Sequence, residues 1–127
     1  MRIIENVISD RGSRYAVSGG PAINAEAAAD FLSSLKQTKK FARATHNSWA
    51  LLLDPPEGSR EALKGDDGEV GAGGAILRML EREDLCNHII VVTRWYGGVK
   101  LGGDRFRHVT AAVRAYLSAL RDTPDRP

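Results

Sequence analysis

Hydrophobic and polar positions divide the chain into short blocks, and the most regular block is Ile89–Leu120. It opens with four β-branched residues in a row at 89–92 (IIVV), a pattern typical of a central strand that is covered on both sides. Glycine pairs at 97–98 and 102–103 follow this strand. The next segment has apolar residues at spacings of three and four, which predicts a helix with one buried stripe. The stripe consists of Phe106, Val109, Val113, Tyr116 and Leu120.

The same pattern predicts three earlier strands and two earlier helices. Strands at Ile3–Ser9 and Ser13–Gly19 are joined by a short turn that ends in a glycine, as in a β-hairpin. A third strand is expected at Ala44–Leu53. The helices are expected after Asn24, a suitable N-cap, and at about Gly74–Leu85.

This order of strand, strand, helix, strand, helix, strand and helix predicts an α+β domain. The simplest arrangement has two layers, with a mixed four-stranded sheet and three helices on one of its faces. The other face of the sheet would then be partly open. A single domain is expected over residues 1–121, followed by a flexible tail at 122–127.

Composition restricts the function only weakly. A formal net charge of +2 is too small to argue for nucleic-acid binding. The single cysteine, Cys86, excludes an internal disulfide and suits a reducing compartment. No run of about 20 apolar residues is present, and Met1–Asp10 has no sustained apolar core. We therefore expect a cytoplasmic protein that makes no membrane contact.

Arg94 lies in an otherwise apolar strand, so a guanidinium buried there needs an acidic partner. The candidates are Asp66, Asp67 and Glu69, in a stretch at 55–74 that is longer than most loops of compact domains. One interpretation is structural, with an arginine–carboxylate pair that fastens this loop to the strand. The other is a recognition site at the end of the strand, where ligands bind in many α/β sheets. The spacing matches no EF-hand, so it does not favour a divalent cation.

The glycine-rich turn after this strand also has two interpretations. The glycine pairs at 97–98 and 102–103, with Lys100 and Arg105 beside them, form a candidate anion site before the next helix. Their spacing matches neither of the familiar nucleotide-binding glycine motifs. The simpler interpretation is that the glycines allow a tight turn from strand to helix.

His46 is expected near Arg94, on another strand of the same sheet. A lone histidine on a strand is more often a hydrogen-bonded structural residue than a catalytic base. Together with Glu69 and Arg94 it still defines a hydrolase hypothesis. A further hypothesis is RNA binding by the open sheet face or by two basic groups. These groups are Lys36, Lys39, Lys40 and Arg43, and Arg107, Arg114 and Arg121.

Four ordered motifs resemble those of a known family. They are 11–15 (RGSRY), 45–47 (THN), 66–69 (DDGE) with Gly73 and Gly74, and 92–98 (VTRWYGG) with Leu101 and Gly102. Over about Arg11–Leu120 the chain resembles the Impact N-terminal domain family, which includes bacterial YigZ, and its eukaryotic branch in particular. The resemblance implies the fold of the second domain of the fifth small-subunit ribosomal protein. It also implies a regulator of translation in the amino-acid-starvation response.

We therefore expect a non-catalytic Impact-type binding module whose partner is a protein of the translation or starvation-response machinery, or the ribosome. RNA binding and hydrolysis stay open as alternatives. No cofactor and no metal is expected. The candidate binding residues are His46, Asp66, Asp67, Glu69, Arg94, Tyr96, Gly97, Gly98, Lys100 and Arg105.

Overall fold

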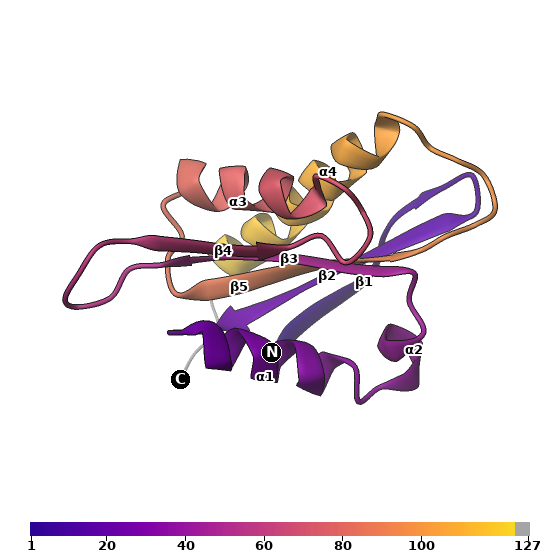
Figure 1. Cartoon of the computed structure of the whole chain (residues 1–127). Coiled ribbons are helices and arrows are strands. Elements are labelled where there is room, and N and C mark those ends of the chain that lie inside the picture. Colours follow the sequence, from indigo (N-terminus) through magenta and orange to yellow (C-terminus); the bar gives the residue numbers. More distant parts are fainter. Residues whose placement is uncertain (124–127) are drawn as a thin grey trace.

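The computed structural model describes residues 1–123, which form a five-stranded sheet with helices on both faces (Figure 1). The strands are β1 (Arg2–Asp10), β2 (Ser13–Pro21), β3 (His46–Leu53), β4 (Glu61–Gly65) and β5 (His88–Trp95). The helices are α1 (Ala25–Leu35), α2 (Lys39–Ala42), α3 (Ala72–Arg82) and α4 (Asp104–Asp122). The strand order is β1-β2-β5-β3-β4, and every neighbouring pair is antiparallel. The predicted α+β class is confirmed.

β5 is the middle strand of the sheet, as its apolar run predicts. Its side chains alternate between the two faces. Ile90 and Val92 belong to a core with α3 and α4, whereas Ile89 and Val91 belong to a second core with α1 and α2. All four side chains are at most 2% exposed. Burial on both faces explains why no polar position interrupts this run.

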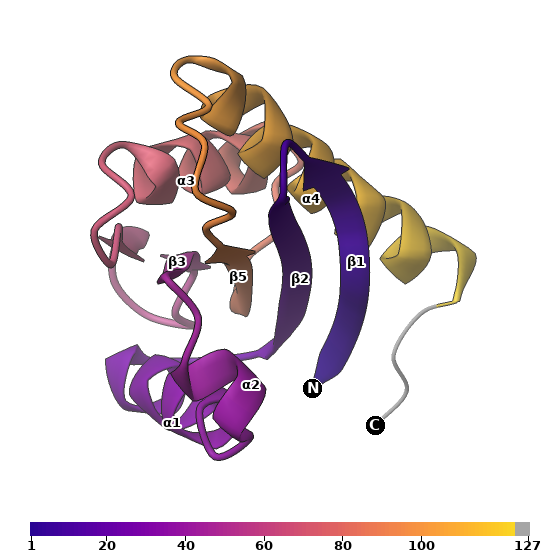
Figure 2. The same cartoon turned by 90° about the vertical axis from the view of Figure 1, so that its right-hand side faces the viewer.

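The helices do not share one face of the sheet, so this part of the prediction is wrong. α3 and α4 cover one face, and α1 and α2 lie on the opposite face (Figures 1 and 2). The domain therefore has three layers instead of two, and the face predicted to be partly open is covered by α1 over the central strands. The apolar stripe of a helix shows that one side is buried, but it does not show which face of a sheet that side covers.

The sheet also has five antiparallel strands instead of four mixed ones. The sequence pattern missed β4, because Glu61–Gly65 (EALKG) has a single large apolar residue, Leu63. Such a composition suits an edge strand. β4 pairs with β3 from Trp49 opposite Gly65 to Leu53 opposite Glu61. This extra strand reverses the chain before α3 crosses over the sheet, so β5 arrives antiparallel to β3.

The two ends of the described chain lie beside each other. Arg2 in β1 donates from Nη1 to the carbonyl oxygen of Ala119 at 2.9 Å and from Nη2 to that of Thr123. α4 continues to Asp122, and residues 124–127 of the predicted tail lie outside the described residues. No helix within residues 1–123 is long and apolar enough to cross a bilayer.

Candidate functional site

One end of the sheet brings the four sequence motifs together. The β1–β2 turn, the start of β3, the turn before α3 and the loop after β5 meet there, beside the start of α4 (Figure 2). The strand register places three side chains in one row, because Tyr15 in β2 is opposite Arg94 in β5, and Arg94 is opposite His46 in β3. Opposite residues point to the same face of a sheet. Here it is the face that α3 and α4 cover.

Arg94 forms a buried ion pair with Glu69. Its Nη1 donates to both carboxylate oxygens of Glu69, at 3.0 and 2.9 Å. The two side chains are only 7% and 4% exposed. The guanidinium carbon also lies 5.7 Å from the ring centre of Tyr15 and 5.6 Å from that of Tyr96, within the range of cation–π contacts. The expected attachment of the acidic turn to the strand is therefore present, and Glu69 is the partner.

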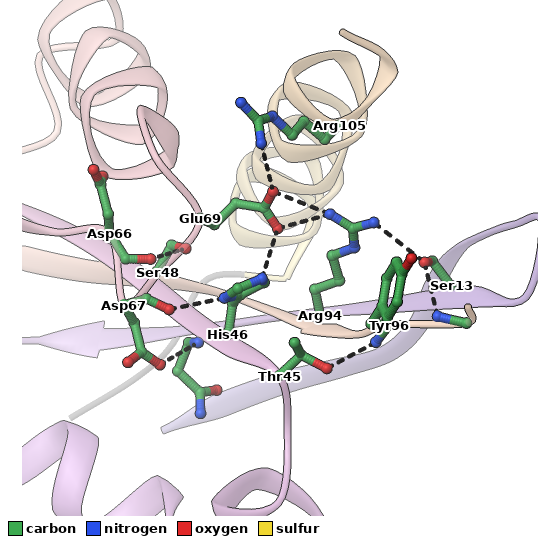
Figure 3. A network of polar contacts seen from close by, with 12 residues as sticks. Ser13, Thr45, His46, Ser48, Asp66, Asp67, Glu69, Arg94, Tyr96 and Arg105 are labelled. Carbon is green, nitrogen blue, oxygen red and sulfur yellow. Dashed lines mark hydrogen bonds and ion pairs between the residues drawn. The ribbon is translucent and has the colours of Figure 1, made fainter. Parts of the chain in front are cut away.

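Two more side chains point toward the Glu69 carboxylate (Figure 3). Nε2 of His46 is 3.6 Å from Oε2, and Nη1 of Arg105 is 3.7 Å from Oε1. Both distances are longer than a hydrogen bond. Nδ1 of His46 lies 2.8 Å from the carbonyl oxygen of Asp67. A carbonyl can only accept, so Nδ1 donates this hydrogen bond and Nε2 faces Glu69.

Asp66 and Asp67 hold the acidic turn in shape. The carboxylate of Asp66 accepts hydrogen bonds from the N–H groups of Gly71 and Gly73, at 3.0 and 2.8 Å, and these bonds lower the pKa of Asp66. The carboxylate of Asp67 accepts from the N–H of Asn47 at 2.8 Å. The acidic side chains of the turn thus face different partners. Within residues 1–123, no group of three or more metal-ligating side chains converges.

Two hydroxyl residues, Ser13 and Thr45, fix the loop after β5, and the sequence pattern assigned them no role. The N–H of Tyr96 donates to Oγ1 of Thr45 at 2.9 Å, and the N–H of Gly97 donates to Oγ of Ser13 at 3.2 Å. Oγ of Ser13 also accepts from Nη2 of Arg94 at 3.4 Å. The sequence feature that could have identified both hydroxyl residues is their position inside the RGSRY and THN motifs.

Gly97 is required by a close approach of two backbones. A Cβ atom added to it would lie 2.0 Å from the carbonyl carbon of Gly12, in the β1–β2 turn. The loop after β5 therefore packs directly against this hairpin turn. The simpler interpretation of the glycine pair, as a device for tight packing, accounts for Gly97.

These contacts surround a cleft of about 530 Å³ between the acidic turn, the loop after β5 and the start of α4. Among the candidate residues, the cleft is lined by His46, Glu69, Arg94, Tyr96, Lys100 and Arg105. The rest of its lining comes from Thr45, Gly68, Leu101 and Gly102. Asp66, Asp67, Gly97 and Gly98 are not among the residues that line it.

The cleft is positively charged. In the part of the chain that the structure describes, Arg94, Lys100 and Arg105 line it together with a single carboxylate, that of Glu69. The side chain of Lys100 is exposed and has no hydrogen bond or ion pair within the described residues. The Nε atoms of Arg94 and Arg105 are buried without a hydrogen-bond partner in residues 1–123. The cleft therefore has donors and positive charge to offer to an anionic group.

The two basic groups considered for RNA binding do not share a face. α2 begins with Lys39 and Lys40 and packs through Phe41 on the α1 side of the sheet. α4 covers the other side (Figure 1). Three of their members are also paired with acids, Lys40 with Glu5, Arg107 with Asp104 and Arg121 with Glu83. This arrangement removes the shared basic face, and α1 covers the central strands of the sheet face that the RNA hypothesis also considered.

The fold and the cleft define a class of protein, a small α+β module with a positively charged cleft at one end of an antiparallel sheet. Comparison with known families gives its affiliation, because the model of the Impact N-terminal domain matches residues 11–117. The chain belongs to the Impact N-terminal domain family, as the four motifs predicted.

Relatives of known name support this assignment. Protein IMPACT of Mus musculus is 38% identical over 122 residues, which cover 93% of this chain and 38% of the mouse protein. Protein IMPACT of Homo sapiens is 38% identical over 112 residues, or 87% of this chain and 35% of the human protein. The chain therefore spans well under half the length of these two relatives.

Two solved structures have the same fold. The two-domain translational regulator Yih1 superposes with a TM-score of 0.60 and 32% identity, over 90% of this chain and 44% of Yih1. A crystal structure of a hypothetical protein superposes with a TM-score of 0.74 and 28% identity, over 94% of this chain and 57% of that one.

Proposed function

We propose that this chain is a non-catalytic binding module that regulates translation through a protein partner or the ribosome. The observation that carries the proposal is the Impact N-terminal domain match over residues 11–117, together with 32% identity to Yih1, a translational regulator. The chain covers 44% of Yih1, so the proposed role is that of the shared domain alone.

The cleft at the end of the sheet is the proposed partner site. Tyr96 at its wall is 47% exposed, and Lys100 is exposed as well. Tyrosine and arginine are among the residues that contribute most of the binding energy at protein interfaces. The buried ion pair between Arg94 and Glu69 fixes these two lining residues. The exposed side chains of the cleft therefore project from a rigid base.

The environment of Glu69 favours binding over hydrolysis. A general base needs a lone pair that reaches the proton of a substrate. Both oxygens of Glu69 accept from Arg94, and its side chain is 4% exposed. His46 donates to the carbonyl of Asp67 and turns its other nitrogen toward Glu69. Glu69 is thus held in internal contacts, and Nε2 of His46 faces the Glu69 carboxylate.

Affinity capture from a lysate of cells that encode this chain tests the proposal. The immobilised full chain is compared with two variants that change charge equally, Arg105→Glu and Arg114→Glu. Arg105 lines the cleft, whereas Arg114 is exposed on α4 and does not line it. We expect the wild type and Arg114→Glu to enrich ribosomal proteins or translation factors, and Arg105→Glu to lose them. Failure of the wild type to enrich any translation component over an unrelated bait would overturn the proposal.

A further inference from the structure

We infer that the cleft recognises an acidic segment of a partner protein, with a carboxylate bound between Lys100 and Arg105 beside the ring of Tyr96. The inference rests on the proposed function, since it names the chemistry of the partner that the module binds. Three features of the cleft support it, namely its unbalanced charge, the exposed apolar residues next in sequence to its lining residues, and its small set of cations.

The charge in the cleft is not balanced from within. Among residues 1–123, Glu69 is the only carboxylate that lines the cleft, and both oxygens of Glu69 accept from Arg94, at 3.0 and 2.9 Å. Arg105 remains 3.7 Å from this carboxylate, which is too far for a hydrogen bond. Lys100 has no polar partner among the described residues. A carboxylate from outside would therefore supply hydrogen-bond acceptors that Glu69 does not supply to these two cations.

The surroundings of the two cations strengthen the attraction for a carboxylate. Leu101, which lines the cleft, is 5% exposed, and the guanidinium of Arg94 lies against the ring of Tyr96. Apolar walls keep water away from a bound charge, so the interaction is stronger there than on an open surface. A carboxylate should therefore bind more tightly in the cleft than at an isolated lysine on the open surface.

Exposed apolar residues next in sequence to the lining residues suit a peptide with apolar residues next to its acidic one. Tyr96 and Val99 are 47% and 46% exposed, and Val99 directly precedes Lys100 in the loop after β5. Val70 is 70% exposed and directly follows Glu69, which lines the cleft. Exposed apolar side chains beside a polar cleft are typical of protein interaction sites.

The small set of cations in the cleft argues for a protein segment over RNA. A nucleic-acid site needs a row of cations that follows the phosphate backbone, with aromatic rings along it. Trp95, another aromatic residue at this end of the sheet, has Lys40 at 5.4 Å and Arg14 at 6.0 Å from its ring, and packs with the α1 core on the opposite face. A concave site of about 530 Å³ accommodates a few side chains.

The test is a fluorescence anisotropy titration of the full chain with a labelled peptide of alternating glutamate and leucine. A second peptide has glutamine in place of every glutamate. We expect saturable binding of the acidic peptide, and binding of the glutamine peptide that is weaker by at least about tenfold. Lys100→Glu and Arg105→Glu should each weaken binding of the acidic peptide to a similar extent. The matched control Arg114→Glu should change its affinity by less than about twofold, because Arg114 does not line the cleft.

Three results would overturn the inference. The first is the absence of saturable binding of the acidic peptide. The second is an equal loss in Arg114→Glu, which would indicate general attraction to a basic protein. The third is tighter binding of a single-stranded RNA oligonucleotide that the same cleft variants abolish. If affinity capture still recovers translation components in any of these cases, the proposed function stands and only the acidic ligand is wrong. If capture fails while the peptide binds the cleft, the role in translation is wrong.

Discussion

Arg94 and Glu69 are 25 residues apart in the chain, yet one guanidinium nitrogen contacts both oxygens of the carboxylate in a site that is almost closed to water. The pair joins the end of β5 to the turn before α3. Since the His46 and Arg105 side chains both point to the same carboxylate, Glu69 is the point around which the cleft is organised. Removal of either partner leaves a buried charge without its counterion.

Arg94→Ala should therefore destabilise the fold by about 3–5 kcal/mol. Urea denaturation at neutral pH measures this loss. The double variant Arg94→Met with Glu69→Leu removes both charges and keeps most of the side-chain volume, so it should be clearly more stable than Arg94→Ala. An Arg94→Ala protein with the unfolding midpoint of the wild type would show that the pair contributes nothing to the fold.

Gly97→Ala should lower stability by about 1–3 kcal/mol, because its new methyl group collides with the backbone of Gly12 and the loop has to move. Gly103→Ala is the matched control. A Cβ at Gly103 meets no atom within 4 Å, and its φ of −66° suits alanine. We expect the control to lie within about 0.5 kcal/mol of the wild type in thermal denaturation. Equal behaviour of the two variants would contradict the close packing of the loop on the hairpin turn.

Asp66 should make the stability of the domain sensitive to acid. Hydrogen bonds from Gly71 and Gly73 lower the pKa of Asp66 in the folded chain below the ordinary value of 3.8. Its stabilising contribution is therefore complete above that value and is lost as the pH falls through the folded pKa. Asp66→Asn should cost about 1 kcal/mol at neutral pH. The difference between the variant and the wild type should shrink below about pH 4 in a pH series of urea denaturations, and a constant difference would contradict this role.

Two buried tyrosines differ in what their hydroxyl groups contact. Both are 0% exposed, but the hydroxyl of Tyr116 lies 2.7 Å from Nε2 of His88, whereas that of Tyr15 has no hydrogen-bond partner within residues 1–123. Burial raises the pKa of Tyr15 to about 12. Tyr116→Phe should cost about 1–2 kcal/mol, while Tyr15→Phe should be neutral or slightly stabilising. Chemical denaturation measures the free energy of unfolding of both variants. A larger loss of stability for Tyr15→Phe than for Tyr116→Phe would contradict these roles of the two hydroxyl groups.

Local patterns predicted the elements whose burial is regular. β5 stands out because both of its faces are buried, and α4 stands out because its apolar stripe is long. β4 was missed because an edge strand needs few apolar residues, and the position of α1 was wrong because a helix stripe does not specify a face of the sheet. Long-range placement of this kind depends on how whole elements pack, which no short window of sequence contains.

The candidate site was predictable to the extent that burial of a charge demands a partner. An arginine in an apolar strand indicated a nearby carboxylate, and Glu69 provides it. The sequence did not decide between the three acidic residues of the turn, because that choice depends on the φ of +50° at Asp67 and on the amides that Asp66 caps. Ser13 and Thr45 act on the loop through backbone contacts, which residue types alone do not indicate.

The most direct test of the cleft as the functional site is an NMR titration of the isotope-labelled chain with the partner recovered by affinity capture. Amide shifts should change first and most at Thr45, Gly68, Tyr96, Lys100 and Gly102, which line the cleft. The amides of Leu117 and Leu120, which line a separate small groove beside the end of α3, should stay unchanged. Shifts that concentrate at this second groove and spare the cleft would contradict the account.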